Sequence, residues 1–150
     1  MIVINELDIT VEAEYILDLK KNKLHDCLGC WSCWLKTPGR CALRDLDEFY
    51  EHFFQSEKVV FYLKPVCHFV SGNVKTLMDR LIVSALPYIN YKTGASKHTP
   101  RYKRMPDIEI YYENNFSSSE QEKLFQEYLI YSYQQLGIKI LKLEPIGGQR

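Results

Sequence analysis

The sequence has no excess of charge of either sign. Its 150 residues include 19 Lys and Arg and 19 Asp and Glu, so the formal net charge is zero at pH 7. The basic residues are scattered rather than clustered, which leaves no electrostatic surface for the backbone of a nucleic acid or for an anionic membrane. We therefore expect neither a nucleic-acid partner nor a membrane partner.

Long hydrophobic runs are also absent. No apolar window approaches the roughly 20 residues that a membrane-spanning helix needs, and the first ten residues contain acids but no cationic run before an apolar stretch. Repeats and low-complexity tracts are missing as well. Because 46% of the residues are hydrophobic, a chain of this length can bury one core. We expect a single domain over residues 1–150 in a soluble, cytoplasmic protein.

Strand and helix patterns alternate along the chain. The apolar runs of strand length are MIVINEL and EYILDL near the N-terminus, KVVFYL at 58–63, IEIYY from Ile108 and IKILKL at 138–143. The continuous run KVVFYL is typical of a strand that is covered on both faces. Between the runs lie amphipathic stretches with helical spacing. This alternation indicates an open, largely parallel α/β sheet.

The expected helices have recognisable ends. An apolar stripe runs from Leu46 to Phe54. Ser71 suits the N-cap of the next helix, Ser119 begins a capping box, and Gly137 suits a C-terminal cap. Residues 87–106, which are rich in proline and in basic residues, are predicted to form a surface excursion.

Four of the five cysteines lie within one turn-rich stretch, HDCLGCWSCWLKTPGRC. They are Cys27, Cys30, Cys33 and Cys41. The first three recur every three residues, and a Pro-Gly pair returns the chain toward them before the fourth. A cubane iron–sulfur cluster needs several thiolates that converge on one small volume. Tetrahedral zinc, with His25 as a further ligand, is a second interpretation.

Two other interpretations of the cysteines stay open. Cys27 and Cys30 could act as a dithiol redox pair if their thiol pKa is lowered. Alternatively, the cysteines and the interleaved Trp31 and Trp34 could form a packed turn without metal, because free cysteine is often buried as a small hydrophobic residue.

The order of segments carries a resemblance to a known family. CLGCWSCWLKTPGRC is followed by an acidic amphipathic helix and then by KVVFYLKPVCHFVSGNVKTLMDRL. In these features the chain resembles the NADPH-dependent FMN reductase family, including its iron–sulfur flavoprotein branch, from about Ala13 onward. The matching positions are Pro65, Val66, Lys75, Asp79 and Arg80. The resemblance implies a flavodoxin-like, three-layer fold, FMN at the carboxyl ends of the strands, and electrons from NAD(P)H. It also favours a structural role for Asp79 and Arg80.

The start of the chain departs from that family. Family members begin with a strand, a Ser-rich or Gly-rich loop that holds the FMN phosphate, and a first helix. Here the few residues between MIVINEL and EYILDL can form neither the loop nor the helix, and parallel neighbours normally need a crossover of roughly a dozen residues. We therefore expect Ile2–Glu6 and Tyr15–Leu19 to form an antiparallel hairpin on or near the sheet edge.

The loop after KVVFYL is the expected cofactor loop. Lys64 stands where the family has Ser, Cys67 stands where it has Tyr, and the loop is one residue shorter. The resemblance nevertheless implies contacts with FMN from this loop. The candidate cofactor-binding residues are Pro65, Val66, Cys67, His68, Ser71 and Gly72.

Two functions follow from these patterns. In the first, the protein is a diverged FMN-dependent NAD(P)H oxidoreductase, with the cysteines as a further redox centre and with a second copy or a related subunit that helps to hold the phosphate. In the second, FMN and catalysis are lost, and the domain is a binding or thiol-sensing module. Because the phosphate loop is missing, we expect no tight binding of FMN to an isolated monomer.

Overall fold

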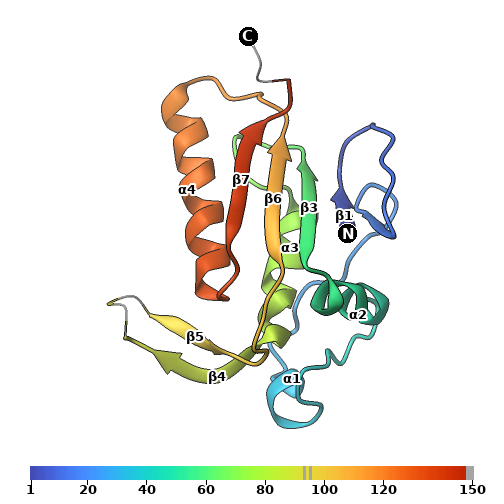
Figure 1. Ribbon diagram of the computed structural model, residues 1–150, viewed down its shortest axis with the longest axis vertical. Helices are drawn as coiled ribbons and strands as arrows, with labels where there is room; N and C mark the ends of the chain where they lie inside the picture. The colour runs from blue at the N-terminus through green and yellow to red at the C-terminus, as the bar shows by residue number, and fades with distance from the viewer. Residues whose placement is uncertain (93, 95, 148–150) are drawn as a thin grey trace.

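The computed structural model describes residues 1–92, 94 and 96–147. Its main sheet has five strands in the order β2-β1-β3-β6-β7 (Figure 1). These strands are β1 (Ile2–Asn5), β2 (Tyr15–Asp18), β3 (Lys58–Leu63), β6 (Asp107–Tyr112) and β7 (Ile140–Pro145). Every neighbouring pair is parallel. The prediction of a largely parallel α/β sheet is confirmed.

Three helices lie where the apolar stripes predict them, and a short further helix lies within the cysteine stretch. The helices are α1 (Ser32–Leu35), α2 (Asp47–Gln55), α3 (Gly72–Arg80), the 3-10 helix η1 (Leu81–Ser84) and α4 (Ser119–Gln135). Ser71 caps α3 as expected, because its side chain accepts a hydrogen bond from the Val74 amide. The cap of α4 lies one residue earlier than predicted, since Ser118 rather than Ser119 accepts from the Gln121 amide.

The helices α2, α3 and α4 all pack on one face of the sheet (Figure 1). Strand side chains such as Ile4, Phe61 and Ile110 point into this core. Right-handed crossovers explain the arrangement. The connections after β2, β3 and β6 run in one direction across the sheet and lie on one face, whereas the connection after β1 runs the other way.

The other face of the sheet carries no helix in the described residues. The described residues therefore form two layers, whereas the resemblance led us to expect three. Val3 and Val60 on this face are only 2% and 5% exposed, and they line a cavity of about 380 Å³ together with residues 10–12. Farther along the face the side chains are polar. Lys58 pairs with Glu109 at 3.3 Å, and the Tyr111 hydroxyl donates to the same carboxylate.

The expected N-terminal hairpin is wrong. β1 and β2 are parallel, with Ile2 opposite Tyr15, and β1 lies inside the sheet between β2 and β3. The connection is residues 6–14, and nine extended residues reach up to about 30 Å. A strand of four residues is roughly 13 Å long, so the chain can return to the start of β2 without forming a helix.

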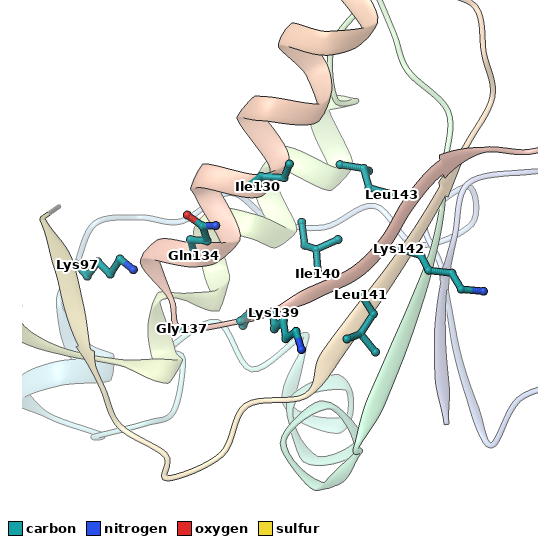
Figure 2. Close-up of a pocket in the computed structure, with 10 residues that line it drawn as sticks. Lys97, Ile130, Gln134, Gly137, Lys139, Ile140, Leu141, Lys142 and Leu143 are labelled. Atoms are coloured by element: carbon teal, nitrogen blue, oxygen red, sulfur yellow. The ribbon is translucent and has the colours of Figure 1, made fainter. Parts of the chain in front are cut away.

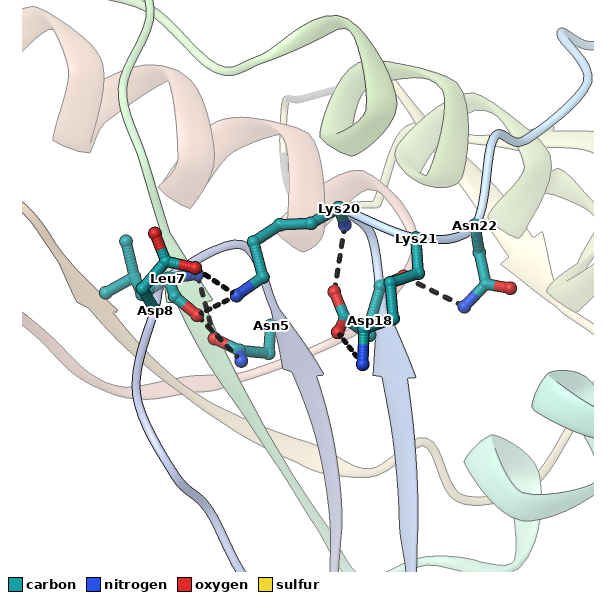
Figure 3. A network of polar contacts seen from close by, with 7 residues as sticks. All are labelled: Asn5, Leu7, Asp8, Asp18, Lys20, Lys21 and Asn22. Carbon is teal, nitrogen blue, oxygen red and sulfur yellow. Dashed lines mark hydrogen bonds and ion pairs between the residues drawn. The ribbon is translucent and has the colours of Figure 1, made fainter.

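Polar contacts hold the carboxyl ends of β1 and β2 together (Figure 3). The Lys20 ammonium donates to the Leu7 carbonyl oxygen at 2.7 Å and pairs with the Asp8 carboxylate. The Asn5 side chain accepts from the Leu7 amide and donates to the Leu7 carbonyl. These bonds fix the first turn of the connection.

The predicted surface excursion, residues 87–106, contains regular structure in its described part, whereas its positions 93 and 95 lie outside the described residues. β4 (Ala85–Asn90) and β5 (Lys97–Pro100) pair antiparallel as a separate two-stranded sheet. This hairpin projects beyond the amino end of β7 and the C-terminal end of α4 (Figure 1). Across the described ranges, no helix combines the length and the hydropathy that a membrane crossing requires.

Candidate functional site

The cysteine stretch folds into a compact loop around α1. Two of its cysteines precede the helix, one lies within it, and one follows it. Their side chains line one cavity with a volume of about 30 Å³; these residues are Cys27, Cys30, Cys33 and Cys41. Such a volume is close to the share of one water molecule in the liquid. The four cysteines therefore border the same small cavity, and their role as ligands stays a prediction.

All five cysteines are free thiols. The fifth, Cys67, lies in the loop after β3, far along the chain from the other four. Cys67 is thus a thiol outside the cavity, and it can serve as an internal control for substitutions of the other four.

Backbone conformation and one indole bond shape the cysteine loop. Gly29 and Trp31 both have positive φ, at 60° and 58°. Glycine adopts this conformation freely, whereas a residue with a side chain loses roughly 1–2 kcal/mol. Trp31 adopts this conformation although its side chain is 59% exposed, with its ring edge-on to that of Trp34. The Trp34 indole N–H donates to the Ala85 carbonyl oxygen at 2.9 Å, which ties α1 to the start of β4.

The thiols affect one another electrostatically. Burial raises the pKa of the Cys33 thiol, and the neighbouring Cys41, Cys27 and Cys30 raise it further. By contrast, hydrogen bonds from Ser32 lower the pKa of the exposed Cys30 thiol. Four thiolates together would repel one another, so the set can ionise only when a cation or a metal offsets the charge.

Arg80, the last residue of α3, supplies a cation beside these thiols. Its side chain is 1% exposed and lines the same cavity. One nitrogen, Nη2, donates to the Cys41 sulfur at 3.3 Å. The Asp45 carboxylate binds both terminal nitrogens, at 2.5 Å and 2.8 Å, and the His25 carbonyl accepts from Nη1 at 3.1 Å. Burial opposes the charge of Arg80, but Asp45, Tyr50 and Cys41 together hold its pKa above the usual value.

The remaining nitrogen of Arg80, Nε, is buried and has no hydrogen-bond partner among the described residues. A second arginine, Arg101, also reaches this region. Its Nη2 donates to the carbonyl oxygens of Cys33 and Ala85, and its Nε donates to that of Val83. Arg101 therefore contacts backbone oxygens, whereas Arg80 contacts a sulfur.

The four cysteines border one cavity but do not form a set of metal ligands as the structure stands. Within the described ranges, no three His, Cys, Asp or Glu side chains are grouped so that they could hold one ion. Tetrahedral zinc with bonds of about 2.3 Å needs sulfurs less than about 4 Å apart, whereas a cluster has its thiolates at the corners of a larger core. The unpaired Nε of Arg80 suits an anionic group. The cavity of about 30 Å³ is too small for a cluster as the structure stands.

The candidate flavin loop lies at the carboxyl end of β3, beside the end of β1. Here the Glu6 carboxylate of the chain itself accepts hydrogen bonds from groups that a phosphate would need. Glu6, which follows β1, accepts from the Lys64 amide at 3.0 Å and from the Ser71 hydroxyl. Burial raises the pKa of Glu6, and the bonds from Ser71 and Lys64 offset part of this rise. An anionic phosphate placed here would meet a carboxylate instead of free N–H groups.

The other predicted cofactor residues form the tip of the same loop. Cys67 and His68 both have positive φ, at 50° and 61°, in a tight turn closed by two backbone hydrogen bonds between Val66 and Phe69. Both side chains are exposed. Pro65 is buried, and its carbonyl accepts from the Asn115 amide group. These bonds fold the loop into a tight turn.

A larger cavity lies elsewhere. It has a volume of about 610 Å³ and lies between the C-terminal part of α4 and the start of β7, with Lys97 of β5 at its border (Figure 2). Three lysines line it, but their ammonium groups stand apart, and the remaining lining is largely aliphatic (Figure 2). It brings together none of the predicted site residues, so we assign it no chemistry.

Comparison with protein-family models finds no match for this chain, and comparison with curated proteins finds none either.

Two residues at these sites were missed by sequence reasoning. Asp45 lies only four residues after Cys41, and Glu6 lies near the end of the first apolar run, directly after β1. A single acid beside a motif is too common a pattern to be informative. Arg80 was noticed, but only as part of an Asp-Arg pair at a helix end, and its contact with Cys41 crosses 39 residues of sequence.

Proposed function

We propose that this chain is a redox protein with a flavodoxin-like fold and an iron–sulfur cluster as its redox centre. The proposed ligands are Cys27, Cys30, Cys33 and Cys41. The observation that carries the proposal is the shared cavity of four thiols, which is also lined by a buried arginine with an unpaired N–H. The fold assignment is supported by the strand order, since β2-β1-β3-β6-β7 corresponds to the doubly wound order 2-1-3-4-5.

When bound, the cluster would supply one-electron transfer. The chain's own residues would form the surroundings of the cluster. Cys27 and Cys30 are exposed, so the site lies at the surface, within reach of a redox partner or of a small redox substrate such as NAD(P)H. Arg80 and Asp45 hold the buried side of the site, and the Trp34 bond to Ala85 keeps α1 in position.

Anaerobic reconstitution with iron and sulfide tests the proposal. The expected result is a broad visible absorbance band with about four irons and four sulfides per chain. Cys33→Ser should lose the cluster, whereas the matched control Cys67→Ser should retain it. A colourless protein, or equal retention in the two variants, would contradict the proposal. Binding of zinc alone, with no iron retained, would do the same.

A flavin at the β1–β3 crevice is the second candidate function. It is supported by the strand order, because ligands of doubly wound sheets bind where neighbouring crossovers diverge, and by the loop Pro65–Gly72 at that point. Glu6 opposes it. We propose that FMN, if it is used, is held jointly with a second copy or a related subunit, and that a chain without flavin acts through its thiols alone.

Titration of FMN, followed by quenching of flavin fluorescence, tests the flavin function. Charge-assisted bonds contribute about 1.5–3 kcal/mol each. The Glu6→Gln variant weakens the competition for the Lys64 amide and the Ser71 hydroxyl and should bind FMN at least about tenfold more tightly than the wild type. Nanomolar affinity in the wild-type monomer would refute the argument based on Glu6. No binding by either variant at any protein concentration would rule out the flavin function.

A further inference from the structure

The outer edge of β7 leaves the hydrophobic core of the sheet open. β7 is the last strand in the order β2-β1-β3-β6-β7, and no strand of the described residues pairs with its outer side. On β6, Ile108 and Ile110 are fully buried. Their neighbours in the ladder, Ile140 and Leu143, are only half-buried, and they line the cavity of about 610 Å³ beside α4 (Figure 2). Another element of structure is therefore needed to complete the core at this edge.

The backbone of β7 offers hydrogen bonds on the same side. The Ile146 amide donates to the Tyr112 carbonyl oxygen of β6. Because backbone groups of successive residues point alternately to the two sides of a strand, Glu144 also faces β6, whereas Leu143 and Pro145 face outward. Leu143 presents one N–H and one C=O, and Pro145 presents only a C=O. Backbone groups of this kind along a sheet edge form a template for a further strand.

The charges of β7 indicate which strand fits this edge. Lys142 lies opposite Glu109 and Glu144 lies opposite Tyr111, so both project from the face of the sheet that carries no helix. In an antiparallel pair of two β7 strands with a two-fold axis at Leu143, Lys142 lies opposite the partner's Glu144, and the reverse pair forms by symmetry. The neighbouring registers place two lysines or two glutamates opposite each other, which is unfavourable.

The cavity beside this edge has matching electrostatics. Its lining includes three lysines and no acidic residue, so an incoming strand that carries a carboxylate complements its charge. The sequence of β7 itself supplies that carboxylate, through Glu144.

We propose that β7 pairs antiparallel with β7 of a second copy of this chain, around a two-fold axis at Leu143, so that one continuous sheet runs through both copies. The two Leu143 side chains meet at the axis and close the open ends of the two cores. Leu141 and Ile146, which are 44% and 42% exposed, lie on either side of Leu143 and become covered. An edge of six residues is small beside a standard interface of about 800 Å² per partner, so the dimer forms reversibly. This inference does not rest on the proposed function, because β6 and β7 separate this edge from the β1–β3 crevice.

Sedimentation velocity of the reduced, metal-free protein over a range of concentrations tests the proposal. Wild type should form a dimer as the concentration rises. Lys142→Glu and Glu144→Lys each place like charges opposite each other twice, so each should weaken the dimer at least about tenfold. The double variant with both substitutions has opposite charges again and should dimerise like the wild type. An equimolar mixture of the two single variants should form a mixed dimer for the same reason. The matched control is Lys23→Glu, an exposed lysine after β2 at the other edge of the sheet, which should leave the dimer unchanged.

Hydrogen exchange of the unsubstituted protein gives a test that does not depend on how the variants fold. The Leu143 amide should exchange more slowly as the concentration rises, and the Ile146 amide, which already has a partner in β6, should change less. A wild type that stays monomeric at its highest soluble concentration overturns the proposal. A dimer that persists in both single variants lies on another surface, such as the face of the sheet without helices, and overturns it as well. So does a failure of both the double variant and the mixture to restore the dimer. Neither iron nor FMN takes part in any of these measurements, so their outcome leaves the proposed function unaffected.

Discussion

Removal of Asp45 should destabilise the metal-free protein more than removal of any nearby acid. Breaking a buried ion pair costs about 3–5 kcal/mol, because the remaining charge loses its partner. Arg80 is 1% exposed, but the Asp45 side chain is 24% exposed, and the guanidinium would keep its bonds to His25 and Cys41. We therefore expect Asp45→Ala to lower the free energy of unfolding by about 3 kcal/mol, the lower end of that range.

Urea denaturation of reduced, metal-free protein measures this effect. For a chain of this size, about 3 kcal/mol corresponds to a fall in melting temperature of roughly 6–12 °C. The matched control is Asp47→Ala, two residues further on. Its arginine partners, Arg40 and Arg44, are 57% and 52% exposed, so that substitution should cost about 1 kcal/mol or less. Equal losses in the two variants would refute the assignment of Asp45 as the buried counter-ion.

The pH dependence gives the same prediction a second test. The hydrogen bond from Arg80 is the main reason that the pKa of Asp45 lies below its usual value. A depressed acid pKa stabilises the folded state above the unfolded pKa of about 3.9, and this stabilisation is lost as the pH falls through the lower, folded value. The difference between wild type and Asp45→Ala should be constant from neutral pH to about pH 5 and should shrink only below about pH 4. A difference that shrinks near neutral pH would contradict this cause.

Three further substitutions have defined outcomes. Burial raises the pKa of Glu6 above its usual 4.5, so the free energy of unfolding of the wild type should fall as the pH rises above that value, whereas Glu6→Gln should show a flatter profile in urea titrations. Trp34→Phe removes the indole donor to the Ala85 carbonyl and should cost about 1 kcal/mol; unchanged stability would show that this bond does not anchor α1. His68→Gly relieves a positive φ of 61° and should raise the free energy of unfolding by about 1 kcal/mol, so calorimetry that finds a lower melting temperature would contradict it.

Elements with a strong local pattern could be predicted from the sequence. The strand at 58–63 has the predicted bounds, and α3 begins after the predicted cap, Ser71. The last strand begins two residues later than predicted, at Ile140, because Gly137 and the residues after it first complete the end of α4. Boundaries of this kind depend on tertiary contacts that periodicity does not report.

The direction of β2 could not be predicted from chain length alone. The expectation of a hairpin rested on the usual length of parallel crossovers, but a strand as short as Ile2–Asn5 needs much less chain for the return. The hairpin of β4 and β5 was missed because its prolines and basic residues look like a loop. The two-layer arrangement did have a signal, since β6, with the sequence DIEIYY, alternates between partly exposed and buried positions, a pattern typical of a sheet with one solvated face.

The cysteine site was only partly predictable, because residues from other segments contribute to it. The spacing of the thiols suggested that they converge, and they do share a cavity. The residues that give this cavity its charge come from elsewhere, since Arg80 ends α3 and Asp45 precedes α2. Contacts between segments this far apart follow from the packing of the helices, and no local pattern encodes them.

The connection between β1 and β2 makes this fold unusually open to changes in chain length. The register of these strands is set by their backbone ladder and by side chains on the helical face, whereas Glu6, Leu7 and Asp8 hold the first turn of the connection in place. Insertions at such a place are tolerated when they do not disturb hydrogen-bonded or buried backbone. An amphipathic helix grafted between Asp8 and Glu14 would lie over Val3 and Val60 and would carry a new helix N-terminus to the crevice beside Glu6. The same scaffold could in this way gain an anion-binding element by a single insertion, with every strand left in its present order.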